Sequence, residues 1–292
     1  MMFSPQRHRL WGLLCAVFAL CISAGAQPVL DPAARQLSDE LAPLLGERPI
    51  PFKAGEELHY KIGWGIFAVG TAVIKTEKAE WEGQPAWKFT MQARTNSFAD
   101  KFYKVRNEAT SYTDLGLTRS LHYVNSQREG GSEKDTLFEF DWDENRVRYQ
   151  NVTDGTIREW IAVPDHIYDV IGLTFLLRTL PLDLGAELSA PTTNGKEVML
   201  STVEVTKKEE KKFRIGKYDT VLVEPNVKDL GGVFKKSDGA SIYFWFSDDK
   251  RQLPLRMESE VAVGSFWVEL EKVVLPDDTV IEKETDLPRR RR

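Results

Sequence analysis

Apolar and polar residues alternate over most of this chain, and this pattern constrains its fold more than any other feature. Leu58, Tyr60 and Ile62 occupy one set of alternate positions, while His59 and Lys61 occupy the other. Successive side chains of a β-strand face opposite sides of the sheet, so a period of two is typical of half-buried strands. The sequence therefore predicts a β-rich protein.

The same alternation recurs in about a dozen segments separated by turn-forming residues. Short polar turns at 143–145 and 153–155 favour tight hairpins, so neighbouring strands should run antiparallel. The charged run 207–212 is interpreted as the solvated end of a hairpin. The predicted strands cover residues 58–64, 68–74, 87–94, 101–112, 118–127, 136–142, 146–152, 156–163, 197–205, 212–215, 219–225, 240–246, 253–263 and 265–274.

One strong helical pattern interrupts the strands. Asp165 is a suitable N-cap, apolar residues at helical spacing follow as far as Leu180, and Pro181 ends the pattern. Its apolar positions form two stripes, as in a helix buried on two sides. The predicted fold is mainly β: a strongly curved antiparallel sheet, half-barrel or roll-like, wrapped on this one central helix. A short N-terminal helix is expected before Gly46.

The first 26 residues resemble a secretory signal peptide. A basic start is followed by an apolar segment from Leu10 to Ser23 and by small residues up to a cleavage site near Ala26. The protein is expected in the periplasm or outside the cell. Both cysteines, Cys15 and Cys21, would be removed with this segment. The predicted organisation is a signal peptide at 1–26, a loosely attached N-terminal arm at 27–51, a single β-rich domain at 52–285 and a basic tail at 286–292.

Composition argues against several classes of function. The net charge of −5 does not suggest a nucleic-acid-binding surface. The expected mature chain has no segment suited to span a membrane. His59, His122 and His166 are isolated in sequence, so neither a metal site nor a cofactor is predicted. No nucleophile motif of the G-x-S-x-G type is present, and no catalytic residue is predicted.

The aromatic strand around residues 242–246 suggests a binding site. Four residues, Trp64, Tyr243, Trp245 and Trp267, are predicted to line an apolar cavity for a hydrophobic ligand. The alternative is that these aromatic side chains belong to the core of a central strand covered on both sides.

Several segments together resemble an exported bacterial family, domain of unknown function 3108. The similarity rests on residues 52–64 with 69–72, on 165–178, on 223–225, and most strongly on 244–256 followed by 263–265. The resemblance implies a β-rich envelope protein and supplies neither catalytic residues nor a ligand. A more remote likeness is to curved half-barrels that carry lipoproteins or lipids across the periplasm.

Three functional hypotheses follow. The first is non-enzymatic binding or carriage of a hydrophobic, lipid-like ligand in the periplasm or cell envelope. The second is a scaffold that binds an envelope protein through strand edges and the proline-rich arm. The third and weakest is a hydrolase that uses carboxylates dispersed in the sequence.

Overall fold

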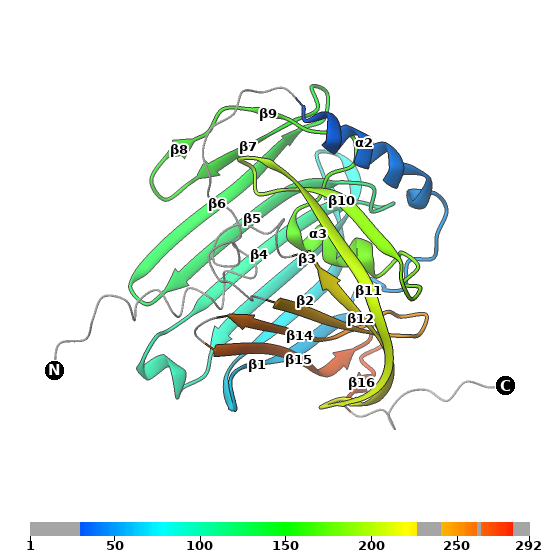
Figure 1. Ribbon diagram of the computed structural model, residues 1–292. Helices are drawn as coiled ribbons and strands as arrows, with labels where there is room; N and C mark the ends of the chain where they lie inside the picture. The colour runs from blue at the N-terminus through cyan, green and yellow to red at the C-terminus, as the bar shows by residue number, and fades with distance from the viewer. Residues whose placement is uncertain (1–29, 227–240, 262–263, 283–292) are drawn as a thin grey trace.

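The structure is a computed structural model that describes residues 30–226, 241–261 and 264–282. The predicted signal peptide, its cleavage site and the basic tail lie outside the described residues. Among those that are described, the chain is mainly β, as the alternating pattern predicted (Figure 1).

One large sheet contains all sixteen named strands, and its hydrogen-bonded neighbours run antiparallel. Along its main path the order is β10-β11-β12-β13-β14-β15-β1-β2-β3-β4-β5-β6-β7-β8, with β16 beside β15 and β9 beside β7. The strands are β1 (Glu57–Trp64), β2 (Phe67–Trp81), β3 (Gln84–Thr95), β4 (Arg106–Asp114), β5 (Ser120–Glu129), β6 (Ser132–Asp141), β7 (Arg146–Asn151), β8 (Thr156–Ile157), β9 (Ile161–Ala162), β10 (Glu187–Thr193), β11 (Val198–Phe213), β12 (Gly216–Pro225), β13 (Ser241–Ser247), β14 (Pro254–Val261), β15 (Gly264–Val274) and β16 (Val280–Ile281).

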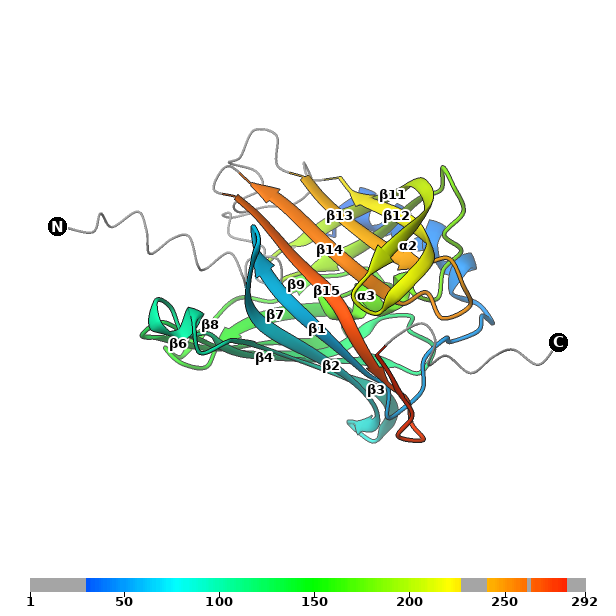
Figure 2. The ribbon, with the colours of Figure 1, turned by 90° about the horizontal axis from the view of Figure 1, so that it is seen from below.

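The sheet is bent near β1 and β2, with β13–β15 on one side of the bend and β3–β6 on the other (Figure 2). Both predicted hairpins are confirmed. Asn145 lies between β6 and β7 with φ 46°, and Gly155 lies between β7 and β8 with φ 77°. Asparagine and glycine tolerate such left-handed backbone angles at low cost, which explains these residues at these turns.

The charge run 207–212 is mostly exposed and lies at the turn end of the β11–β12 hairpin, as predicted, but it is part of the strand and not of the turn. It lies inside β11, whose pairing with β12 continues to Phe213 and Gly216. The strand extends through the charges because several of them have partners: Lys208 binds Asp248 at 3.0 Å, and Lys207 binds Glu209 at 2.6 Å.

The predicted N-terminal helix is present as α2 (Pro32–Leu41), which continues into the 3₁₀ helix η2 (Ala42–Leu45). Asp31 caps it by accepting a hydrogen bond from the Ala33 amide at 2.9 Å. The expectation of a loose attachment is wrong for this part of the arm. Leu41 and Leu45 are buried in one apolar cluster with Leu176 and Ala190, so α2 packs against the rest of the molecule.

The central helical pattern forms a shorter helix than expected. Helix α3 spans Val170–Leu177 and is capped by Asp169, not by Asp165. The residues before it are held by the sheet, because the Ile167 carbonyl accepts a hydrogen bond from Ser120 and Tyr168 pairs with Thr192. A backbone already bonded to strands is not available to begin a helix.

Helix α3 is buried, as its apolar composition predicted. Phe175 is 1% exposed, and its ring stacks on that of Phe89 with centroids 3.7 Å apart. Phe52 meets the same ring edge-on at 5.0 Å. We call the face of the sheet that packs against α3 the inner face; on β3 it carries Phe89 and Met91. Burial of this helix on this face is a main part of the core.

Candidate functional site

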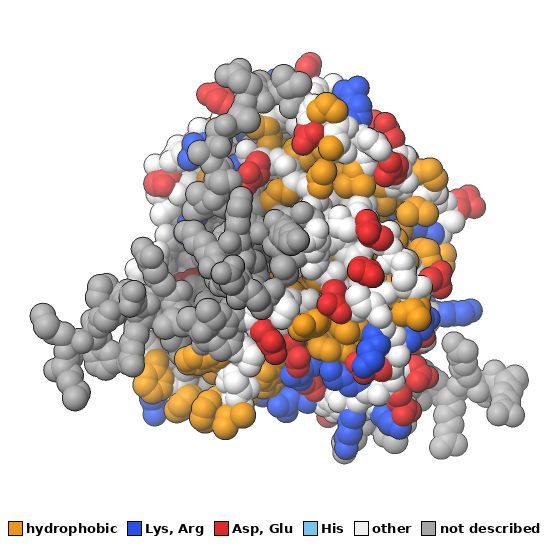
Figure 3. All heavy atoms as spheres, viewed as in Figure 1, with side chains coloured by type: hydrophobic (Ala, Val, Ile, Leu, Met, Phe, Trp, Pro, Cys, Tyr) orange, Lys and Arg blue, Asp and Glu red, His pale blue; other side chains and the backbone are white. Residues whose placement is uncertain are grey.

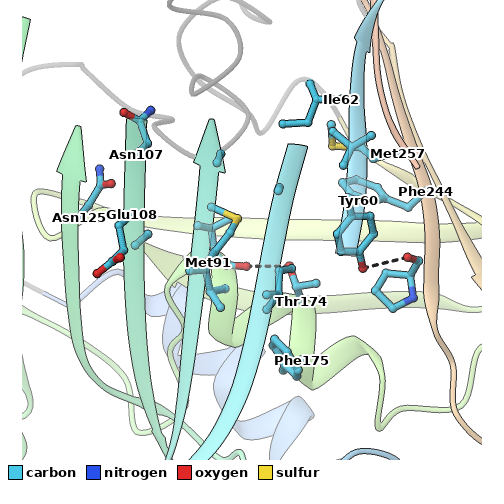
Figure 4. A pocket seen from close by; sticks show the side chains of 18 of the residues that line it. Tyr60, Ile62, Met91, Asn107, Glu108, Asn125, Thr174, Phe175, Phe244 and Met257 are labelled. Carbon is cyan, nitrogen blue, oxygen red and sulfur yellow. Dashed lines mark hydrogen bonds between the residues drawn. The ribbon is translucent and has the colours of Figure 1, made fainter. Parts of the chain in front are cut away.

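A cavity of about 130 Å³ lies between α3 and the inner face of the sheet (Figure 4). Helix α3 contributes Val170, Ile171, Thr174 and Phe175 to its wall. The strands contribute the remaining side chains, most of which are apolar: Tyr60, Ile62, Ala72, Ile74, Met91, Ala93, Asn107, Glu108, Ala109, Asn125, Gln127, Phe244, Pro254, Arg256, Met257 and Val268.

Strand register explains why residues so distant in sequence line one cavity. Ile62 pairs with Val268, Val268 with Met257, and Met257 with Phe244, so four strands place one side chain each in a single row. Paired residues of antiparallel strands point to the same face. The row therefore forms a continuous apolar wall across β1, β15, β14 and β13.

A second row forms the opposite wall. Ile74 pairs with Met91, Met91 with Ala109, and Ala109 with Asn125, across β2 to β5. Small side chains at Ala72 and Ala109 leave space beside the helix that larger residues would fill. The cavity thus results from small residues at inner-face positions.

The cavity is polar at one end. Asn107, Glu108 and Asn125 lie together on one side of it, away from Ile62 and Met257 (Figure 4). The Glu108 carboxylate accepts a hydrogen bond from the Gln92 amide at 2.6 Å. This arrangement suits an amphipathic molecule, with its apolar part against the helix and its polar part at the amide side chains.

Tyr60 contributes an apolar ring to the wall and has its hydroxyl satisfied within the protein. The hydroxyl donates to the Pro254 carbonyl at 3.0 Å, and burial raises the pKa of Tyr60 well above its ordinary value. Tyr60 is therefore neutral, and its hydroxyl is occupied by the backbone.

Buried polar contacts hold α3 in position over the cavity. At its start, Asp169 accepts hydrogen bonds from the amides of Ile171 and Gly172 and from the hydroxyls of Ser111 and Ser120, both at 2.6 Å. At its end, Arg178 donates to Glu56 at 2.6 Å, with both side chains almost fully buried. The helix is thus attached to β4 and β5 at one end and to the segment before β1 at the other.

Asp169 predicts a pH dependence of stability. Burial raises the pKa of its carboxyl, and its four hydrogen bonds oppose that rise without cancelling it. A carboxyl whose pKa is higher in the folded state contributes stability below its unfolded pKa of about 4 and loses it as the pH rises through the folded value. The free energy of unfolding of the wild type minus that of Asp169→Asn is expected to fall as the pH is raised from about 4. Urea unfolding over a pH series measures it, and a difference that increases with pH would contradict this assignment.

The four residues predicted to form the binding site do not line this cavity. Their neighbours do: Phe244 faces the cavity between Tyr243 and Trp245, and Val268 does so beside Trp267. Adjacent residues in a strand point to opposite faces, so the side chains next to Phe244 and Val268 point away from the cavity. The same alternation predicts Phe244 as a cavity residue once the side of the strand that meets α3 is known.

Two of the predicted residues, Tyr243 and Trp245, lie on β13 and make contacts outside this cavity. Trp245 is 5% exposed, donates to Glu209 at 3.0 Å and lies beneath the ammonium group of Lys211. Tyr243 is partly buried, with its ring centroid 6.0 Å from that of Trp245. Trp245 belongs to a buried apolar cluster against which Tyr243 packs, and a ligand-binding role for either residue remains a prediction.

The remaining two predicted residues belong to β1 and β15. Trp267 donates to the Gly65 carbonyl at 2.8 Å, and its ring covers Gly63 so closely that a Cβ there would clash with it. Trp64 stacks on Phe266 with centroids 6.1 Å apart. The four predicted residues thus lie on three strands, β13, β15 and β1, and none of them is part of the wall of this cavity.

Within ranges 30–226, 241–261 and 264–282, histidine, cysteine, aspartate and glutamate do not assemble in groups of three or more that could hold a metal ion. No helix of the described chain combines the length and apolar character needed to cross a membrane.

The fold and the site define a mainly β protein with an apolar cavity between one antiparallel sheet and a short buried helix. The chain belongs to the DUF3108 family. The family model described as "Protein of unknown function (DUF3108)" matches residues 59–271, which contain the whole cavity wall. No curated protein matches the sequence.

Three solved structures resemble this chain at low sequence identity. A beta-barrel-like protein of domain of unknown function DUF1849 from Brucella abortus is 10% identical, with a TM-score of 0.47, over 76% of this chain and 98% of that one. A candidate lipoprotein from Parabacteroides distasonis is 9% identical, with a TM-score of 0.34, over 78% and 99%. A candidate exported protein with a YmcC-like fold from Bacteroides fragilis is 9% identical, with a TM-score of 0.29, over 77% and 98%. Similarity at this level does not define a ligand or a function.

Proposed function

We propose that this protein is a non-enzymatic binding protein for a hydrophobic, lipid-like ligand, exported to the periplasm or cell envelope. In this proposal, residues 1–26 are a signal peptide, residues 52–285 form one β-rich domain, and the curved sheet wraps on α3. The observation that carries the proposal is the apolar cavity with its polar end, lined by α3 and two rows of inner-face side chains.

The size of the cavity limits what it holds. At about 130 Å³ it is similar to engineered apolar cavities of about 150 Å³ that take up benzene. It therefore accommodates one ring or the end of a short acyl chain. A larger amphipathic molecule would insert this apolar end and leave the rest outside, at the side of Asn107 and Asn125.

The polar end favours ligands without a negative charge there. Glu108 is the one carboxylate among the described residues that line the cavity. An uncharged or zwitterionic polar group accepts hydrogen bonds from the amides of Asn107, Asn125 and Gln127, whereas an anion at this end would lie near the Glu108 carboxylate, which is turned toward Gln92. Glycoside hydrolysis requires two carboxyl groups across the substrate, and the described residues of this wall supply one.

Filling the cavity is expected to weaken ligand binding. Ala72 lies on the inner face of β2 and is 7% exposed, so the ring of Ala72→Phe would occupy the cavity. We expect this variant to bind octyl glucoside at least about tenfold more weakly than the wild type, measured by calorimetry. Octanoate, which carries a charge at the same chain length, is expected to bind more weakly than octyl glucoside to the wild type.

The matched control is Val73→Phe, which adds a ring one residue along the same strand on the other face. It is expected to bind octyl glucoside like the wild type. Ala109→Leu fills the same space from β4 and replaces Ala72→Phe if that variant fails to fold. Equal binding by Ala72→Phe and Val73→Phe would contradict the proposal.

Native mass spectrometry of the protein purified from the cells that produce it tests whether a ligand is retained in the cavity.

A further inference from the structure

Four large apolar side chains are exposed at one end of the sheet. Ile66 is 90% exposed and Phe67 59% exposed, at the connection between β1 and β2. Phe98 is 54% exposed and Phe102 68% exposed, on either side of the 3₁₀ helix η3 (Ala99–Lys101) between β3 and β4. We call these four residues the apolar rim.

The two halves of the apolar rim are joined by direct hydrogen bonds. The side chain of Asn96 donates to the Ala68 carbonyl at 2.7 Å, and its backbone amide donates to the Val69 carbonyl at 2.9 Å. The rings of Phe98 and Phe102 contact each other with centroids 5.5 Å apart. Hydrophobic side chains gather on this part of the surface, at the lower left of the space-filling view (Figure 3).

The rim is held in a defined conformation. Asp100 accepts from Arg106 at 2.7 Å and also from Thr95, and these hydrogen bonds lower the pKa of Asp100 to about 2. Asn96 accepts from the amides of Phe98 and Ala99 at the start of the turn. Phe98 and Phe102 are therefore presented to solvent by a connection tied to β3 and β4.

Basic residues surround the rim in a chain that is acidic overall. Residues 94–106 contain Arg94, Lys101, Lys104 and Arg106 against the single acid Asp100, whereas the whole chain has a net charge of −5. Lys101 and Lys104 are exposed. Exposed phenylalanines beside lysines are suited to an anionic bilayer surface, where the rings enter the headgroup region and the cations bind lipid phosphates.

The rim also lies at the end of the sheet toward which the cavity extends. Ile62 and Asn107 line the cavity, and their strands continue directly into the rim, β1 toward Ile66 and β4 back toward Phe102. A ligand that leaves a bilayer at the rim would have a short path to the cavity. A membrane is therefore a more consistent partner for this surface than a protein is.

We propose that the apolar rim docks this protein on an anionic lipid bilayer. The rim inserts Ile66, Phe67, Phe98 and Phe102 peripherally, and Lys101 and Lys104 bind the negatively charged headgroups. The choice of a membrane as the partner rests in part on the proposed function, whereas docking itself uses side chains outside the cavity wall.

Sedimentation with lipid vesicles tests the proposal. All variants are purified from the same cell fraction, and their masses are measured so that chains with the same N-terminus are compared. The wild type is expected to bind phosphatidylcholine vesicles that contain phosphatidylglycerol, and Phe98→Ser with Phe102→Ser is expected to lower its partition coefficient by about tenfold or more. Lys101→Glu with Lys104→Glu is expected to lower binding to the anionic vesicles and leave the weak binding to pure phosphatidylcholine unchanged.

The matched control replaces two equally exposed apolar residues far along the chain. Val152 and Ile157 are 61% and 59% exposed, and Val152→Ser with Ile157→Ser is expected to bind like the wild type. Ala72→Phe is also expected to bind vesicles normally, so failure of the cavity proposal and failure of this one are distinguishable. Equal vesicle binding by the wild type and the Phe98/Phe102 variant would overturn the proposal. So would a stable dimer that this variant dissociates, because the rim would then be a protein interface.

Discussion

Replacing Arg178 by methionine is expected to lower the free energy of unfolding by about 3–5 kcal/mol. Arg178 is fully buried at the end of α3, and its partner Glu56 is 4% exposed. Its guanidinium group also donates to the Arg251 carbonyl at 3.3 Å and lies over the rings of Phe52 and Phe175. Methionine fills similar space but leaves the Glu56 carboxylate buried without a counter-charge, which is the costly part of the change. Urea unfolding at neutral pH measures the loss.

An ion pair at the surface provides the comparison. Arg128 binds Asp135 at 2.8 Å, but both side chains are more than one third exposed to water. Arg128→Met is therefore expected to lower the free energy of unfolding far less than Arg178→Met does, because water already screens this pair. The double variant Glu56→Gln with Arg178→Met should recover part of the loss, because it removes the unpaired charge. If Arg178→Met were as stable as Arg128→Met, the buried pair would not hold the end of α3 as we infer.

The second large effect is expected for Phe175→Ala. The ring is 1% exposed and packs between Phe89 and Phe52. Removing a buried phenylalanine ring typically costs about 3–5 kcal/mol, from lost burial and from the void that remains. Because Phe175 also lines the cavity, the variant should bind decyl glucoside better relative to octyl glucoside than the wild type does.

Phe102→Ala is the control for this experiment. The same side chain is removed from a position that is 68% exposed, so the free energy of unfolding should change by no more than about 0.5 kcal/mol. Thermal and urea unfolding distinguish the two variants. Equal stability of Phe175→Ala and Phe102→Ala would show that α3 is not packed in the core as described.

The strands and turns were predictable because their signals are local. Alternation identified β1 through the positions of Leu58, Tyr60 and Ile62, and turn chemistry identified the hairpins at Asn145 and Gly155. Family membership was also predictable, because the matching segments occur in order along the chain. These features depend on neighbours in sequence, so no knowledge of the tertiary structure was needed.

The start of α3 and the wall of the cavity were not predictable in the same way. Asp165 and Asp169 are both acceptable N-caps, and the choice was made by Ser111 and Ser120, which lie on β4 and β5 and bind the second one. The carboxylate of Asp165 instead accepts a hydrogen bond from Asn145. Contacts between distant segments therefore overrode a local signal.

By itself, the sequence determined that this chain forms antiparallel strands with two chemically distinct faces and one apolar helix. It did not determine which face of each strand would meet that helix, because a period of two is symmetrical with respect to the two sides of a sheet. Tertiary structure made that choice through strand register and the burial of α3, and so placed Phe244 and Val268 in the cavity wall while Tyr243, Trp245 and Trp267 point away from it.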